Sequence, residues 1–211
     1  MTLARQYAWA LLAAALIVAS VEVRADKLPS RSATTAVITN HPTLQDSLDR
    51  LFARSASWRA ALAAVERLGR KAVVVTPKHV QVKDPNSGKI RSFDDDVIAE
   101  VQPLAEHETR VDAVVIVVNL DLLGRLHGPL TTIGDFEDDL DRILAHEIYG
   151  HAFPYLLAGD LSGKCADPVK GQRAEDACAI KRENEIRAEL RLGQRREYGL
   201  DGLTMARRYR E

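Results

Sequence analysis

The pattern of hydrophobic and polar positions divides the chain into three parts. Residues 8–21 are almost entirely apolar, and residues 26–42 are polar, with two prolines and several Ser and Thr. From residue 43 onward, apolar residues recur at helical spacing or gather in β-branched runs. The pattern predicts a flexible leader over 26–42 and a single folded domain over 43–211.

Helical spacing is clearest in two neighbouring segments of the domain. Thr43 is a candidate N-cap, and leucines follow it at three- and four-residue intervals up to Phe52. The pattern restarts after Ser57 and ends before Gly69. These segments predict two amphipathic helices whose apolar stripes face a core, with no chemistry of their own.

Strand signals follow these helices. Residues 72–76 are rich in valine, and residues 79–83 and 89–93 flank a turn-forming Asp-Pro-Asn-Ser-Gly, which predicts a hairpin. Residues 111–122 are dominated by β-branched side chains and predict a buried strand, although periodicity alone does not separate such a run from a buried helix.

Two further helices are predicted in the second half of the chain. The first starts at Asp135, has an apolar face through Ile148, and is expected to stop near Pro154. The second covers residues 177–192. Strands and helices together predict an α+β fold with a small mixed sheet.

The N-terminal 25 residues have the features of a secretory signal peptide. Arg5 precedes the apolar run, and Val23-Arg24-Ala25 offers small residues before a cleavage point. The run is shorter than the roughly 20 residues a membrane-spanning helix needs, so no stable membrane anchor is expected after cleavage. The protein is therefore predicted to be exported, either periplasmic or secreted.

Export also governs how the two cysteines are interpreted. Cys165 and Cys178 are close in sequence, and an oxidising compartment favours a disulfide bond between them. Thiolate ligation of a metal is the alternative, and it suits a reducing cytosol better. A formal net charge of −1 indicates neither a nucleic-acid partner nor an electrostatic membrane binder.

The most informative stretch is His146-Glu147-Ile148-Tyr149-Gly150-His151. Neutral histidines bind zinc, and an adjacent carboxylate handles the proton of an attacking water. Five residues advance an α-helix by about 500°, which leaves the second ring roughly 140° from the first. A local π-type widening would bring the rings together, and Gly150 is placed where backbone strain is easiest to absorb.

A third ligand is expected downstream, in the helix-like segment that contains Glu185 and Glu189. These two residues share one face, whereas Glu183 is expected to point elsewhere. Glu185 could then reach the metal, and Glu189 could support a histidine from behind. A surface helix with solvated charges is the simpler explanation of this segment taken alone.

Residues 146–151 and 184–189 together resemble the motif pair of the dipeptidyl-peptidase III family of zinc exopeptidases. Members of that family have His-Glu-Leu-Leu-Gly-His and a later Glu-Glu-Cys-Arg-Ala-Glu/Asp segment. Asn184 stands where the family has Glu, and Ile186 stands where it has Cys. The resemblance covers about a fifth of the chain and implies zinc chemistry rather than dipeptide-removing specificity.

This resemblance implies a role for each matching residue. His146, His151 and Glu185 would bind Zn2+, and Glu147 would act as the general base. Arg187 and Glu189 would lie in the layer of side chains around the ligands. Tyr198 is the preferred donor to the oxyanion, with Tyr149, Tyr155, Arg187 and His127 as the other candidates.

The implied fold is a small zincin-like, gluzincin-like metallopeptidase domain. Its active-site helix would pack on a second ligand-bearing helix, and residues 111–122 would form an edge strand that binds the substrate backbone. The expected substrate is a peptide or protein. The alternatives are an exported metal-binding or interaction domain without turnover, and a non-haem iron oxygenase, since two His and one carboxylate also suit Fe(II).

Overall fold

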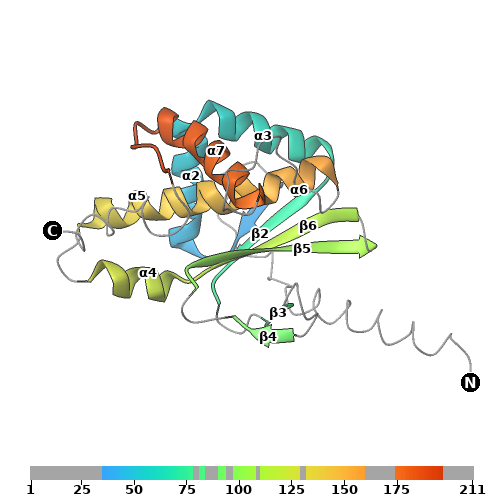
Figure 1. Ribbon diagram of the computed structural model, residues 1–211, viewed down its shortest axis with the longest axis horizontal. Helices are drawn as coiled ribbons and strands as arrows, with labels where there is room; N and C mark the ends of the chain where they lie inside the picture. The colour runs from blue at the N-terminus through green and yellow to red at the C-terminus, as the bar shows by residue number, and fades with distance from the viewer. Residues whose placement is uncertain are drawn as a thin grey trace, which may run out of the picture. The chain divides into compact units, whose positions relative to one another are not determined.

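The described part of the chain contains a four-stranded mixed sheet, against which helices pack (Figure 1). The computed structural model describes residues 35–77, 81–83, 90–93, 97–107, 110–128, 132–159 and 174–196. The order of strands across the sheet is β1 (Val37–Thr39), β2 (Lys71–Val75), β6 (Arg110–Val118) and β5 (Ala99–His107). The first three are parallel, and β5 is antiparallel to β6. The predicted α+β class with a small mixed sheet is confirmed.

The β-branched run forms strand β6, near the centre of the sheet. Val111, Val114 and Ile116 are fully buried, as expected of a strand covered on its inner face. The strand ends at Val118, earlier than predicted, because the side chain of Asn119 accepts a hydrogen bond from the backbone of Leu122. Asn119 thereby caps helix α4 (Leu120–His127).

The position of β6 corrects the predicted edge strand. β6 pairs with β2 on one side and β5 on the other, so its backbone hydrogen-bonding groups are used on both sides. β1 and β5 are the strands at the two ends of the sheet order. Residues 111–122 are therefore not an edge to which an extended peptide could add.

Strand β1 lies inside the predicted flexible leader, so the leader does not extend to residue 42. Val37 pairs in parallel register with Ala72, and Ala36 and Val37 are both buried. The apolar tetrapeptide at 36–39 is short, but pairing with β2 allows it to cover the core. Residues 1–34, including the predicted signal peptide, lie outside the described residues.

The two predicted N-terminal helices are present, with different caps. Helix α2 (Pro42–Arg54) begins after His41, with Pro42 in its first turn, so Thr43 is not the cap. Helix α3 (Ala56–Arg67) begins after Ser55, whose hydroxyl accepts a hydrogen bond from the Trp58 amide at 3.0 Å. The predicted hairpin is confirmed as β3 (Gln81–Lys83) paired antiparallel with β4 (Ile90–Ser92); residues 84–89 and 94–96 are not described.

One nearly continuous helical rod runs across the sheet, through α5 (Ile133–Leu144), a π-helix η2 (Ala145–Ala152) and α6 (Phe153–Ala158). Thr132 and Asp135 form a capping box at its start, so Asp135 is not itself the cap. Pro154 does not stop the rod, because it falls in the first turn of α6, where a missing amide hydrogen is tolerated. The rod ends at Gly159, which adopts a positive φ of 74°.

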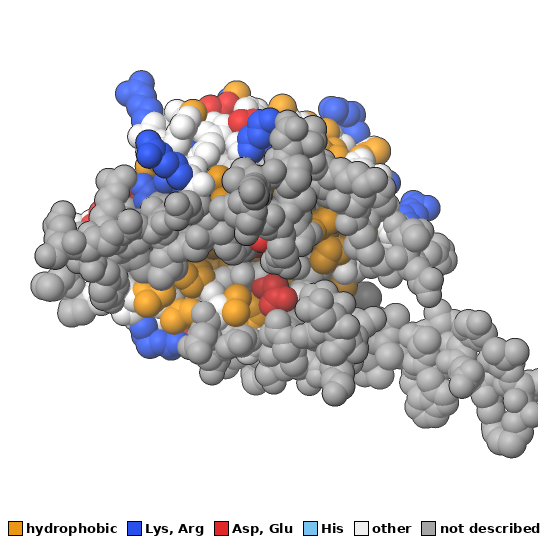
Figure 2. Space-filling view, in the orientation of Figure 1, with side chains coloured by type: hydrophobic (Ala, Val, Ile, Leu, Met, Phe, Trp, Pro, Cys, Tyr) orange, Lys and Arg blue, Asp and Glu red, His pale blue; other side chains and the backbone are white. Residues whose placement is uncertain are grey.

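Helices α3, α6 and α7 (Ala174–Glu189) lie on the same side of the sheet (Figure 1). No helix among the described residues is long and apolar enough to cross a membrane. The described Lys and Arg side chains on the face shown in Figure 2 are scattered over the helices rather than gathered in one stripe.

Candidate functional site

The two histidines of the motif lie on π-helix η2, which continues directly from α5. A π-helix has more residues per turn than an α-helix, so a separation of five residues returns a side chain to nearly the same face. The rings of His146 and His151 lie against each other, with centroids 4.9 Å apart and planes at 85°. The predicted widening of the helix is confirmed.

The spacing of these two rings agrees with a shared metal ion. Zinc binds imidazole nitrogen at about 2.0–2.1 Å in roughly tetrahedral geometry, which sets two ligand rings about 5 Å apart, centre to centre. The separation of 4.9 Å matches that value. His146 and His151 are therefore candidates for two ligands of one ion.

A buried carboxylate orients the first histidine. The Nδ1 atom of His146 lies 3.0 Å from Oε2 of Glu183, and both side chains are almost completely buried. An ionised carboxylate only accepts hydrogen bonds, so the 3.0 Å contact favours a proton on Nδ1 over the longer 3.3 Å approach of Arg195 Nη1, which could only donate. In the neutral imidazole this places the lone pair on Nε2, the tautomer that a metal ligand requires.

Glu183 is in turn held by two arginines. Arg187 Nη1 donates to Oε1 at 2.7 Å, and Arg195 Nη1 donates to Oε2 at 2.9 Å. Burial alone would raise the pKa of Glu183, but the hydrogen bond and charge of His146 and the two guanidinium groups lower it to about 2. The carboxylate behind His146 is therefore ionised throughout the physiological range.

The segment after α7 delivers Arg195 to this cluster. The Asn184 side chain forms two hydrogen bonds with the backbone of Arg195, at 2.7 Å and 2.8 Å. Arg187 donates to the carbonyl of Gly193 at 2.5 Å, which fixes the same segment two residues before Arg195. Asn184, a departure from the dipeptidyl-peptidase III motif, thus positions a second cation beside Glu183.

Glu147 follows His146 directly, and the pKa of its carboxyl shifts in the opposite direction to that of Glu183. Its side chain is buried, and burial raises the pKa of the carboxyl, with the charges of Glu183 and Glu100 adding to the increase. The charges of His146 and Arg195 oppose that increase. Buried carboxyls with a raised pKa are frequent among catalytic groups, so Glu147 is a candidate acid or base.

Gly150 serves the packing of η2 rather than an unusual backbone conformation. A Cβ atom at this position would lie 3.0 Å from the Cβ of Ala179 and 3.1 Å from its Cα and carbonyl oxygen. Only glycine allows α7 to approach the π-helix this closely. Arg182 also donates to the Gly150 carbonyl at 3.0 Å, which satisfies a backbone acceptor within the π-helix.

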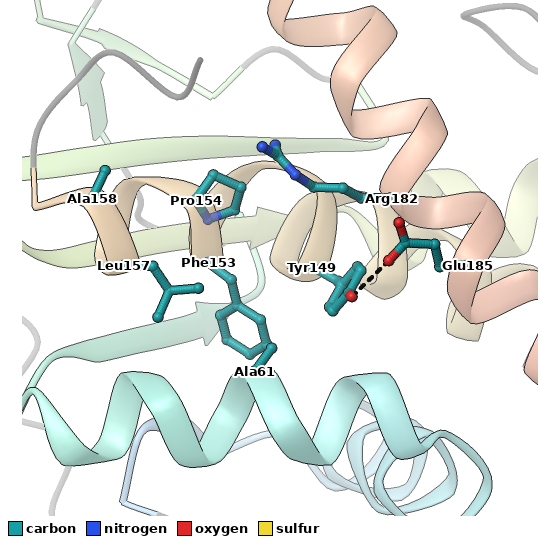
Figure 3. Close-up of a pocket in the computed structure, with 8 residues that line it drawn as sticks. All are labelled: Ala61, Tyr149, Phe153, Pro154, Leu157, Ala158, Arg182 and Glu185. Atoms are coloured by element: carbon teal, nitrogen blue, oxygen red, sulfur yellow. Dashed lines mark hydrogen bonds between the residues drawn. The ribbon is translucent and has the colours of Figure 1, made fainter. Parts of the chain in front are cut away.

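The structure does not bring Glu185 to the histidines, which corrects the predicted ligand set. Among the residues that the structure describes, no group of three His, Cys, Asp or Glu side chains could hold a metal ion. The exposed carboxylate of Glu185 instead accepts a hydrogen bond from the Tyr149 hydroxyl at 2.8 Å (Figure 3). Burial and this contact raise the pKa of Tyr149 to about 12.

The rotation of α7 about its axis explains why Glu183, and not Glu185, faces the site. Ala179, Ile186 and Leu190 are buried, and Glu183 falls on the same stripe at intervals of three and four residues. Glu185 is one residue before Ile186 and lies outside the stripe. The signal was therefore present in the sequence: Glu183 is in phase with the apolar residues of its own helix.

Glu189 also differs from its predicted role. Its carboxylate accepts hydrogen bonds from the hydroxyls of Ser55 and Ser57, and from the Ser57 amide at 3.2 Å, at the start of α3. Negative charge is favoured at a helix N-terminus, so Glu189 joins α7 to α3. The contact behind His146 that was expected of Glu189 is made by Glu183.

The remaining predicted site residues divide between described and undescribed parts of the chain. Cys178 is buried and disulfide-bonded, while Cys165, the other cysteine of the sequence, lies outside the described residues. Tyr198 lies outside them as well. His127 is not in an exposed loop: it is the last residue of α4, and its Nε2 lies 3.1 Å from the buried carboxylate of Asp139.

Comparison with protein-family models, with curated proteins and with solved structures finds no match to this chain. Any functional assignment therefore depends on the site itself.

Proposed function

We propose that the protein is a zinc-dependent metallopeptidase of zincin type, in which His146 and His151 supply two of the metal ligands. The observation that supports this most directly is the π-helix, which turns an over-long motif into a pair of rings spaced for one ion. π-helical segments are rare and are frequently found at functional sites. The buried Glu183, which fixes the tautomer of His146, is the second support.

The proposed chemistry is hydrolysis of a peptide bond by water. Zinc, when bound, would lower the pKa of a water ligand towards about 7 and polarise the substrate carbonyl. Glu147 would accept the proton of the attacking water and return it to the leaving amine. Its raised pKa suits that exchange, because a more basic carboxylate takes up the proton more readily.

The proposed substrate is an extended peptide that pairs with the outer edge of β5. Of the two edge strands of the sheet, β5 is the one that packs beside η2, and Glu100 on β5 is close enough to act on the charge of Glu147. A peptide added to this edge would therefore run past the proposed base. Export of the enzyme remains a prediction from the N-terminal sequence.

The proposal is tested with protein purified in the presence of zinc and assayed for metal content and for cleavage of a peptide mixture. Glu147→Gln should keep the metal and lose about 10²–10⁴-fold in activity, the usual contribution of a general base. His146→Ala and His151→Ala should lose both metal and activity. Glu185→Gln is the matched control on α7 and should change neither.

Three outcomes would favour other functions. Bound zinc with no cleavage of any peptide would favour an exported metal-binding or interaction domain. Iron, rather than zinc, in protein purified without added metal would favour an oxygenase. Wild-type protein that binds no divalent ion would remove the metal centre altogether.

A further inference from the structure

A pocket lies on the side of the rod that faces α3, where Tyr149 and Glu185 meet (Figure 3). Its volume is about 390 Å³, at the small end of the range for ligand sites. The apolar part of the lining comes from α3 and from the end of the rod, and its members are Ala61, Phe153, Pro154, Leu157 and Ala158. This pocket contains none of the residues assigned to the metal centre.

The apolar wall is unusually open for side chains of this kind. Leu157 is 41% exposed, although Phe153 beneath it is almost completely buried. A large aliphatic side chain at the wall of a concave site loses contact with water when a ligand covers it, which favours binding of an apolar group.

Two opposite charges, those of Arg182 and Glu185, line the same pocket without forming a direct ion pair. Arg182 donates to the Gly150 carbonyl at 3.0 Å, and Glu185 accepts from the Tyr149 hydroxyl at 2.8 Å. Among the described residues the two form no ion pair with each other, although they lie one turn apart on α7. Figure 3 shows the reason: Arg182 extends over Pro154, whereas Glu185 turns toward Tyr149.

Both charged groups have hydrogen-bonding capacity left for a ligand. A guanidinium has five N–H donors, and the Gly150 carbonyl uses one nitrogen of Arg182. A carboxylate accepts several hydrogen bonds, and the Tyr149 hydroxyl occupies one oxygen of Glu185. Tyr149 also fixes the direction of that carboxylate, so the site is partly organised before a ligand arrives.

We propose that this pocket binds a small zwitterion with an apolar side chain, namely a free amino acid or the same groups on a short peptide. Arg182 receives the carboxylate, Glu185 receives the ammonium group, and the side chain lies on Phe153 and Leu157. The proposal does not depend on the metal centre or on peptidase activity.

The test removes each ligand charge and each protein charge in turn. Binding of L-phenylalanine, N-acetyl-L-phenylalanine and L-phenylalaninamide is measured by calorimetry or by NMR titration. Wild-type protein should bind L-phenylalanine about tenfold more tightly than either capped analogue, since each cap removes one charge-assisted contact. Glu185→Gln should abolish the preference over the N-acetyl compound only, and Arg182→Gln the preference over the amide only.

The capped ligands keep the test valid if Arg182→Gln weakens the fold through its lost bond to Gly150. A dissociation constant weaker than about 10 mM for L-phenylalanine and for the dipeptide Phe-Phe would overturn the proposal, as would equal binding of all three phenylalanine compounds. Tighter binding of Phe-Phe than of L-phenylalanine would support the proposal with a peptide as occupant. Glu185→Gln should retain zinc throughout, so failure of this pocket is distinguishable from failure of the metal centre.

Discussion

Glu183 and Glu185 lie two residues apart on the same helix, yet the fold uses them in opposite ways. The side chain of Glu183 is 1% exposed, has hydrogen bonds from a histidine and two arginines, and has a pKa of about 2. Glu185 is exposed and accepts one hydroxyl at the mouth of a pocket. The difference follows from rotation about the axis of α7, because two residues correspond to about 200°.

This contrast shows how one helix can serve two sites. The inner face of α7 orients His146, while the adjacent face contributes Arg182 and Glu185 to the pocket beside α3. π-helix η2 lies between the two sites and contributes side chains to both. The proposed metal centre and the pocket can therefore be tested separately by substitutions on α7 alone.

The largest expected effect comes from removing the inner carboxylate. Glu183→Gln leaves Arg187 and Arg195 partly unpaired in a buried setting, and we expect a loss of about 3 kcal/mol in the free energy of unfolding at pH 7. Glu185→Gln, the matched change on the outer face, should shift it by no more than about 0.5 kcal/mol. Urea denaturation of both variants measures these changes in the free energy of unfolding. Equal losses in the two variants would contradict the difference between the buried Glu183 and the exposed Glu185.

The same pair has a pH signature. The pKa of Glu183 is lowered from 4.5 to about 2. The contribution of its charge to the free energy of unfolding is therefore complete above pH 4.5 and declines as the pH falls toward 2. The stability difference between wild type and Glu183→Gln should shrink over that interval. A difference that stays constant from pH 6 to pH 2 would mean that Glu183 is not ionised in the fold.

The next effect tests the contact that places α7 against η2. Gly150→Ala forces a Cβ to within 3.0–3.1 Å of Ala179, and we expect it to cost about 1–3 kcal/mol by overpacking. Gly124→Ala in α4 is the control, since an added Cβ there meets nothing within 4 Å and alanine favours a helix. Thermal unfolding of both proteins, together with zinc content, separates loss of packing from loss of the site.

Glu147 should show a gain in stability when its charge is removed. Its raised pKa means that the folded protein disfavours the ionised form, so Glu147→Gln should be more stable than wild type at neutral pH in the absence of metal. The gain should disappear as the pH falls below about 4.5, where the unfolded chain is protonated too. Denaturation curves with a chelator present test this prediction. If Glu147→Gln is less stable than wild type at pH 7, the folded protein stabilises the ionised carboxylate.

The smallest effect belongs to Glu189, the last acidic residue of α7. Glu189 accepts hydrogen bonds at the start of α3 from an exposed position, and Glu189→Gln should cost about 1 kcal/mol or less, as for other helix caps. Zinc content and cleavage should be unchanged, because Glu189 contacts serines rather than His146. Loss of metal in this variant would restore the role that the sequence predicted for it.

The fold was largely accessible from the sequence because its signals are local. The strand at 110–118 follows from its β-branched composition, and the apolar faces of α2, α3 and α5 follow from side-chain periodicity. Strand β1 was missed because three residues are too few to show a period, and its existence depends on pairing with β2. Pro154 was misleading because its effect depends on where a helix turn begins.

The site was accessible only in part, for a different reason. The π-helix could be predicted, since two histidines five residues apart reach the same face only on a widened helix. The choice among Glu183, Glu185 and Glu189 needed the rotation of α7, which the apolar residues Ile186 and Leu190 encode. Arg195 could not be predicted, because it reaches Glu183 through contacts of Asn184 with an irregular segment.

The π-helix also has a consequence for how the rod tolerates a change in length. One residue added to a regular α-helix rotates every later side chain by about 100°, which would move Phe153 and Leu156 out of the core. Here the wide turn absorbs the extra residue, and both side chains remain buried. Deleting Gly150 would convert the segment to His-Glu-Ile-Tyr-His, the shorter spacing that an ordinary α-helix accommodates, with α6 still in phase. The short and long versions of the motif therefore differ by one residue on the same fold.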